Sequence, residues 1–336
     1  MRNTLGVYGP HSTSNEGIPE PWEDNPVTVG IGVLCEDGDC IVLVSDMRAT
    51  YRGMHVDPHD RAGKQYSFPP FNLAACIAGS GSSAHAVVSE FSTYLRAYAA
   101  EKLKTPERVM VLEHVRDSLE YSRKKELRRL QNCEMEHELG CDLYDWQIGK
   151  LPTGIVFNEY VYRGGLKALR RVRDDFRGKV GIIVGGFLKT GPVLFRGLGF
   201  EPIEESATPP NYVIGGKGAI EANQVLIDRQ QNGEMSLART LLHLYLALKA
   251  AKISDKGVGE PAHYVVIRPW TVPAPHGMLR FNAEHPLLKQ WSKTYRFRST
   301  EPLDTSFAKD LINAALFPDK FRRSQLLGPR TLMGEL

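Results

Sequence analysis

The segment HVDPHD, residues 55–60, combines imidazole and carboxylate side chains, which are residue types that ligate metal ions. A proline interrupts the set, and the segment stands between a strand hairpin and the next strand-like run. We therefore expect a loop on the substrate side of a site rather than a metal centre. The four side chains concerned are His55, Asp57, His59 and Asp60.

A second set of metal-binding residue types occurs at helical spacing. Cys133, His137 and Cys141 follow one another every four residues, which would place them on one face of a helix. Gly140 is expected to end that helix before the third ligand, and no fourth ligand is evident in the sequence. The residues therefore predict no metal site here.

The five cysteines are too few for a disulfide scaffold, and their odd number leaves at least one unpaired within the chain. Cys35 and Cys40 flank a tight turn and could approach each other. We nevertheless expect a reducing compartment and free thiols.

The composition indicates which classes of partner the chain is expected to have. Its 336 residues, 42% of them apolar, can form one large core with appended ends. A net charge of +3 favours neither nucleic acid nor an anionic membrane, and the arginines of LKALRRVRDDF and KFRRSQ lack interleaved aromatic residues. With no membrane-length apolar run and no signal peptide, we expect a cytoplasmic protein without nucleic-acid or membrane partners and without a cofactor.

A strand hairpin is the clearest element of the sequence. The runs TVGIGVL and CIVLVS flank the turn EDGD, whose Asp-Gly pair suits a tight hairpin. A third strand at 72–79 leads into an amphipathic helix. A second helix is expected to begin at Thr105 as N-cap and to project its charged far end into solvent, and a basic helix is expected around 166–176, ending at Gly178.

Strand patterns resume with KVGIIVGGF, GPVLFRGL and NYVIGG, followed by two helical patterns and the strand HYVVIRP. Helices grouped between antiparallel runs predict an α+β fold with sheets stacked face to face under helical layers. Residues 1–27 cannot form a periodic apolar face and are interpreted as a disordered or removable arm. The expected domain spans residues 28–269, and residues 270–336 form a tail with one short helix.

The run TVGIGVLCEDGDCIVLVSDMRAT, followed by GKQYSFPPFNLAACIAGSGS, resembles the start of proteasome β-type subunits and their bacterial ring-forming relatives among the N-terminal nucleophile hydrolases. The resemblance extends over roughly residues 28–268 and implies a four-layer αββα sandwich. In that family a threonine opens the first strand, an aspartate ends the second, a lysine precedes the third, and a glycine after it supplies an oxyanion-hole amide. The resemblance assigns these roles to Thr28, Asp46, Lys64 and Gly79.

The chemistry explains why these residue types belong together. A threonine hydroxyl is a poor nucleophile, and a free α-amine, with a pKa of about 7.7–8.0, can serve as its base. A neighbouring lysine can transfer protons, an aspartate can orient that lysine, and a backbone N–H can stabilise the oxyanion. The four residues would therefore make an acyl-transfer site.

Two positions depart from the family pattern. Gly216 stands where a serine is usual after the strand NYVIGG, and Val258 stands where another serine is usual. Asp255 keeps the acidic position of that second turn and belongs to the expected site. The site would have to work with water in place of the two hydroxyls, or it has lost activity.

The arm decides whether the mechanism can operate. While residues 1–27 are attached, the nitrogen of Thr28 is an amide and cannot act as a base. Since Val27 precedes the threonine, we expect a start at Val27 or processing to free Thr28. The competing interpretation is that the arm is retained, as in non-catalytic α-type subunits.

The resemblance thus implies a threonine-type peptidase that cleaves peptide amide bonds in a peptide or protein substrate. It also implies a homo-oligomeric ring, with an ATPase unfoldase as a further partner. A non-catalytic ring or scaffold subunit and a small-molecule amidase on the same fold remain as alternatives.

Overall fold

The computed structural model describes most of the sandwich and leaves several segments outside the description. Thr28, Asp255 and the short helix expected in the tail lie outside the described residues. The described residues are 29–46, 49–51, 54–56, 64–69, 71–79, 81–104, 110–152, 155–206, 209–254, 258, 262–269 and 278–282.

The first sheet is built around the predicted hairpin. Its five strands lie in the order β10-β1-β2-β11-β12, and the described neighbours pair in antiparallel fashion. The hairpin turns through a single turn of 3₁₀ helix, η1 (Glu36–Gly38), in which Asp37 and Gly38 have φ angles of 57° and 89°. The strands are β1 (Val29–Cys35), β2 (Cys40–Asp46), β10 (Tyr212–Gly216), β11 (Ala262–Ile267) and β12 (Met278–Asn282).

The second sheet also has five antiparallel strands, in the order β5-β6-β7-β8-β9. A separate pair, β3 (Ala49–Tyr51) and β4 (Met54–Val56), follows the first hairpin. The strands of the second sheet are β5 (Gln65–Ser67), β6 (Asn72–Gly79), β7 (Val180–Leu188), β8 (Gly191–Leu198) and β9 (Glu204–Glu205).

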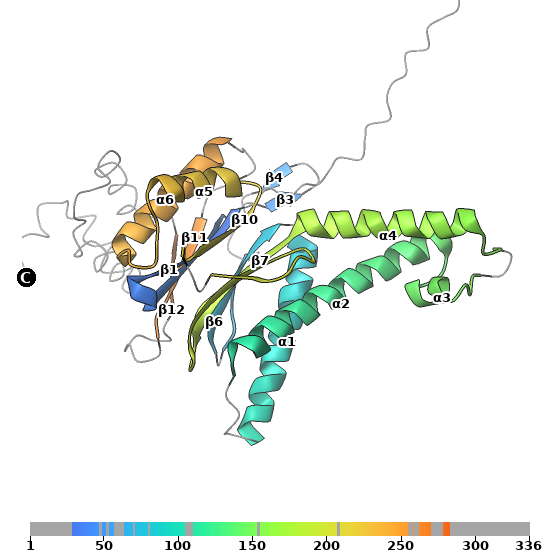
Figure 1. Cartoon of the computed structure of the whole chain (residues 1–336), viewed down its shortest axis with the longest axis horizontal. Coiled ribbons are helices and arrows are strands. Elements are labelled where there is room, and N and C mark those ends of the chain that lie inside the picture. The colour runs from blue at the N-terminus through green and yellow to red at the C-terminus, as the bar shows by residue number, and fades with distance from the viewer. Residues whose placement is uncertain are drawn as a thin grey trace, which may run out of the picture.

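Two helical layers enclose the stacked sheets. Helices α5 (Ala219–Asp228) and α6 (Leu237–Ser254) cover the outer face of the first sheet, whereas α1 (Gly81–Lys104) and α2 (Leu112–Leu139) cover that of the second (Figure 1). The layers therefore form the predicted αββα sandwich, an α+β fold. Within the described part of the chain, no helix has the length and apolar character needed to cross a membrane.

A helical extension, formed by α2, α3 (Leu143–Gln147) and α4 (Glu159–Lys179), reaches beyond the sheets. Helices α2 and α4 run outward together, with the short α3 at the far end (Figure 1). This helical extension has a small apolar core of its own, in which the Trp146 ring covers Gly165. The far end of the second helix, expected to project into solvent, extends beyond the sheets but packs against α3 and α4, where Met135 is buried.

Three element boundaries differ from the sequence prediction. Helix α4 continues through Gly178, where the basic helix was expected to end, to Lys179. Helix α2 begins after Val111 rather than at Thr105, and the Val111 N–H donates to the His114 ring at 3.4 Å. Strand β12 lies within the segment interpreted as a tail, because β11 offers an unpaired edge to which a nearby extended segment can add. The sheet thus extends past residue 269, and the domain limits themselves stay a prediction.

The space between the sheets is filled by a narrow apolar core. A Cβ added at Gly32 would lie 2.7 Å from Leu194 Cδ1 and 2.9 Å from Ile183 Cγ2. Such distances are too short for carbon atoms in contact, so the sheets approach closely because this position has no side chain.

We expect the substitution Gly32→Ala to lower the free energy of unfolding by about 1–3 kcal/mol, because the added methyl must displace packed side chains. Gly178→Ala is the matched control, since a Cβ there meets no atom within 4 Å and lies in a helix, where alanine is favoured over glycine. Urea denaturation of both variants measures the difference. Equal stabilities would show that the two sheets can move apart at little cost.

Candidate active site

Asp46 ends β2 and is fully buried. One carboxylate oxygen, Oδ1, accepts a hydrogen bond of 2.9 Å from the backbone N–H of Val29, the first residue of β1. A buried carboxylate needs such donors, because it has lost its contact with water. The bond therefore ties the start of β1 to the end of β2.

Lys64 reaches the same carboxylate from the second sheet. Its backbone carbonyl accepts a hydrogen bond of 2.8 Å from Ile77 in β6, which fixes the residue just before β5. Its ammonium nitrogen lies 3.5 Å from Asp46 Oδ2, and only 7% of the residue is exposed. The next residue, Gln65, donates a 2.5 Å hydrogen bond to the His263 carbonyl of β11. The two sheets are thus joined here by polar contacts.

Burial lowers the pKa of Lys64 below its ordinary value, while the negative charge of Asp46 acts in the opposite direction. Burial is the larger influence because removing the ammonium from water disfavours its charged form. A lysine in this environment releases a proton more readily than one in solvent. That property suits proton transfer, and the carboxylate keeps the amine oriented.

Sequence analysis missed a second polar pair beside Lys64. The Tyr66 hydroxyl is hydrogen-bonded to His85 Nδ1, and the two rings meet edge to face with centroids 5.6 Å apart. Burial raises the pKa of Tyr66 to about 12, and burial together with the Lys64 charge lowers the pKa of His85. The signal available in the sequence was the alternation of Lys64 and Tyr66, which places both side chains on one face of a strand.

The positions that lack the expected serines lie near Val29. Gly216, with a φ of 100°, pairs with Val29 in the register of β10 and β1. A Cβ at Gly218 would lie 3.4 Å from the Val29 Cβ and 3.2 Å from Val258 Cγ2, and Val258 is buried. Small and apolar groups therefore occupy the place where the resemblance predicts hydroxyls.

The structure thus brings together two of the five predicted site residues, Asp46 and Lys64. Gly79 ends β6 opposite Val180, two residues before α1 begins. Thr28 and Asp255 lie outside the described residues, so their positions stay predictions.

The two candidate metal sets are placed only in part. His55 lies in β4, and residues 57–60 fall outside the description. Cys133 is exposed on α2, while Cys141 is buried beyond the Gly140 cap. Among the residues that the structure describes, no three His, Cys, Asp or Glu side chains are grouped to hold a metal ion.

Comparison with solved structures identifies the fold. The Anbu (Gly-1) mutant from Hyphomicrobium sp. strain MC1 is similar with a TM-score of 0.51 and 16% identity, covering 83% of this chain and 100% of that one. Anbu (ancestral beta-subunit) from Yersinia bercovieri gives a TM-score of 0.52 and 14% identity, covering 82% and 99%. No family model matches the chain, and no curated protein matches it. The likeness shows that the chain has this proteasome-like fold.

The comparison also corrects the sequence assignment. The resemblance to proteasome β-type subunits and their ring-forming relatives placed the chain in the wrong branch, because these structural neighbours are Anbu proteins. The motifs that carried the assignment lie in the first hairpin and the third strand. Those elements form the common core of the sandwich, so they indicate the fold without separating its branches.

The buried Asp46–Lys64 pair leads to a testable prediction about the stability of the fold. We expect Asp46→Asn to lower the free energy of unfolding by about 3–5 kcal/mol, because it removes the negative charge that lies 3.5 Å from the buried Lys64 ammonium. Lys64→Met should cost a similar amount by removing the positive charge beside the buried carboxylate. The double variant should recover much of the loss, since it removes both charges together. Chemical denaturation of the four proteins tests this cycle, and strictly additive losses would contradict the pairing.

Proposed function

We propose that the protein is a threonine-type hydrolase that cleaves peptide amide bonds, with Thr28 as nucleophile and its freed α-amine as base. The observation that carries the proposal is the buried Asp46–Lys64 pair, which is bonded directly to the N–H of Val29. This N–H belongs to the peptide bond formed by residue 28. Consecutive Cα atoms are about 3.8 Å apart, which supports the choice of residue 28 as the proposed nucleophile.

Each neighbouring group has a role in this proposal. Lys64, whose pKa is lowered by burial, transfers protons near the threonine hydroxyl, and Asp46 holds the lysine and the first strand in place. The Gly79 amide stabilises the oxyanion, supported by the start of α1 two residues later, because a helix N-terminus favours negative charge. Asp255 is the acidic partner from the turn after α6.

The two serine hydroxyls expected at positions 216 and 258 are absent, and this affects how protons can be transferred in the proposed reaction. With glycine at 216 and buried Val258 near Val29, water takes over any proton transfer that a serine would provide. The same observation favours the second candidate, a non-catalytic subunit that retains residues 1–27. A small-molecule amidase on this fold is the third candidate function.

We also propose that the chain self-associates, because the Yersinia bercovieri neighbour is named as a subunit.

The test compares the full chain with a chain that begins at Thr28. The shortened chain is expected to cleave peptide amides and to form an adduct with an electrophilic peptide inhibitor, seen as an increase in intact mass. The full chain is expected to do neither, because its residue 28 has no free amine.

Matched substitutions in the shortened chain separate the candidates. Thr28→Ala should abolish both readouts, whereas Thr28→Ser should retain adduct formation because it keeps a hydroxyl on the same amine-bearing residue. A silent shortened chain that still assembles supports the scaffold. Cleavage of acylated amines without cleavage of peptides supports the amidase, and native protein whose mass includes residues 1–27 would exclude the threonine mechanism.

A further inference from the structure

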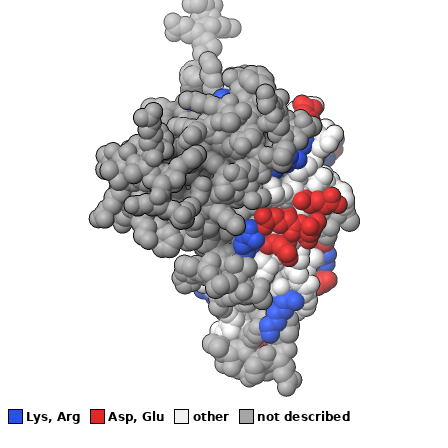
Figure 2. All heavy atoms as spheres, turned by 90° about the vertical axis from the view of Figure 1, so that its left-hand side faces the viewer, with Lys and Arg blue, Asp and Glu red and all other residues white. Residues whose placement is uncertain are grey.

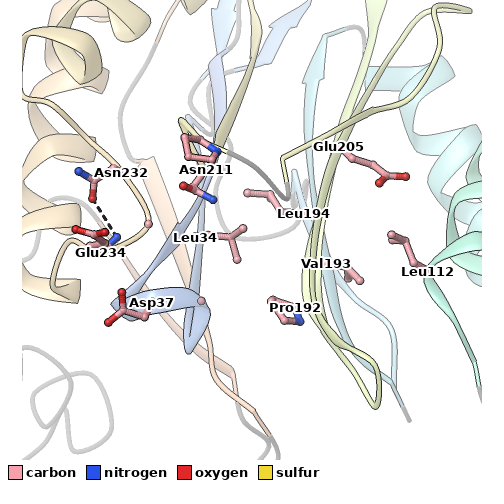
Figure 3. Close-up of a pocket in the computed structure, with 13 residues that line it drawn as sticks. Leu34, Asp37, Leu112, Pro192, Val193, Leu194, Glu205, Asn211, Asn232 and Glu234 are labelled. Carbon is pink, nitrogen blue, oxygen red and sulfur yellow. Dashed lines mark hydrogen bonds between the residues drawn. The ribbon is translucent and has the colours of Figure 1, made fainter.

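Two neighbouring hollows lie along one side of the sandwich, at the edges of the two sheets. The first, of about 560 Å³, lies beside Leu34 near the η1 end of β1 (Figure 3). The second, of about 820 Å³, lies between α5 and strands β8 to β10. Glu205 and Pro209 line both hollows, so the two are neighbours, and they are here together called the edge groove. Leu34 is five residues from Val29, about 17 Å along β1, which separates the first hollow from the candidate active site.

The edge groove has an apolar floor and an apolar wall. Leu34 and Leu194 point toward one another from facing sheets within the first hollow (Figure 3). Along the second hollow, Ile220 and Ile227 of α5 are 80% and 54% exposed. Exposed large apolar side chains at the wall of a groove are typical of a surface that binds a partner.

The lining of the groove carries more negative than positive charge. Of its four carboxylates, Glu204 is paired with Arg196 and Glu205 with Arg116, so among the described residues the excess negative charge rests on Asp37 and Glu234. Arg196 is itself engaged, since it bonds to Glu204 and to the Ile214 carbonyl. Acidic side chains gather in one patch of the described surface, with basic side chains near it (Figure 2). The four carboxylates are those of Asp37, Glu204, Glu205 and Glu234.

One polar group in the groove is left without a partner. Ser206 is 4% exposed and lines the second hollow, and its hydroxyl has no hydrogen-bond partner among the described residues. A buried hydroxyl without a partner costs free energy, so an occupant that offers a donor or acceptor is favoured. The amides of Asn211 and Asn232, which line the first hollow, can donate and accept hydrogen bonds as a peptide backbone requires.

These features describe a site for an extended peptide that is basic and partly apolar. We propose that its occupant is residues 320–330 of the same chain, KFRRSQLLGPR, a segment outside the described residues. The segment has four basic residues, no acidic residue, and the apolar pair Leu326 and Leu327. Its charge complements the carboxylates, and its leucines match the floor between the sheets.

The connection is long enough for docking within one chain. Strand β12 ends at Asn282, and the 38 residues from there to Lys320 can span at most about 125 Å. A tethered segment reaches an effective concentration near millimolar, which favours its own groove over that of a second copy. We therefore assign the interaction to a single chain.

Zero-length carbodiimide crosslinking of the full chain tests the proposal, because it couples a lysine only to a carboxylate in direct contact. Lys320 is expected to couple to Asp37, Glu205 or Glu234, as identified by mass spectrometry of the digested protein. Arg322→Glu with Arg323→Glu should reduce this yield roughly tenfold while leaving both reactive groups in place. Arg296→Glu with Arg298→Glu is the matched control and should leave the yield unchanged.

A second pair of variants tests the groove itself without disturbing the core. Ile227→Glu should reduce the same crosslink, whereas Ile253→Glu, at an isoleucine that is 78% exposed on α6 and does not line the groove, should not. An equal mixture of ¹⁴N and ¹⁵N protein distinguishes the source of the segment. Mixed-label crosslinks would overturn the assignment to a single chain, and absence of Lys320 crosslinks to the groove would overturn the proposal.

Discussion

The close approach of the two sheets is the constraint on which the rest of the structure depends. Gly32 and Gly185 face the opposite sheet at points where even a methyl group would overlap Leu194 or Ile41. Because the sheets lie this close, the end of β2 can meet the residue that precedes β5. The contact between Asp46 and Lys64 therefore follows from backbone packing between the sheets.

The buried pair is costly to form, and it contributes little to stability beyond what apolar side chains could supply. Two charges lose their hydration on burial, and well-packed apolar replacements for such pairs are often neutral or stabilising. The pair is nevertheless held by a backbone bond at Val29 and by the anchored carbonyl of Lys64. A chemical role accounts for such a pair more directly than a structural one, and this is why the proposed function rests on it.

The two ends of the sandwich differ in their chemistry. At the end of β1 that begins with Val29, the Asp46–Lys64 ion pair is buried, so a charge there is poorly screened by water. At the η1 end, the carboxylates of Asp37 and Glu234 are exposed beside an apolar floor. Exposed charges are screened beyond about 8 Å at physiological salt, so they act on a basic segment only when it lies close to them.

The sequence by itself determined the strand hairpin, the order of strands and helices, and the layered α+β fold, because alternation and helical periodicity are local properties of the chain. It also singled out Asp46 and Lys64, through the resemblance of the motifs that contain them to a known family. Only the tertiary structure showed the Tyr66–His85 pair and the edge groove, and only structural comparison corrected the branch. Contacts between residues distant in sequence depend on how closely the sheets pack and on their register, and no local pattern encodes that distance.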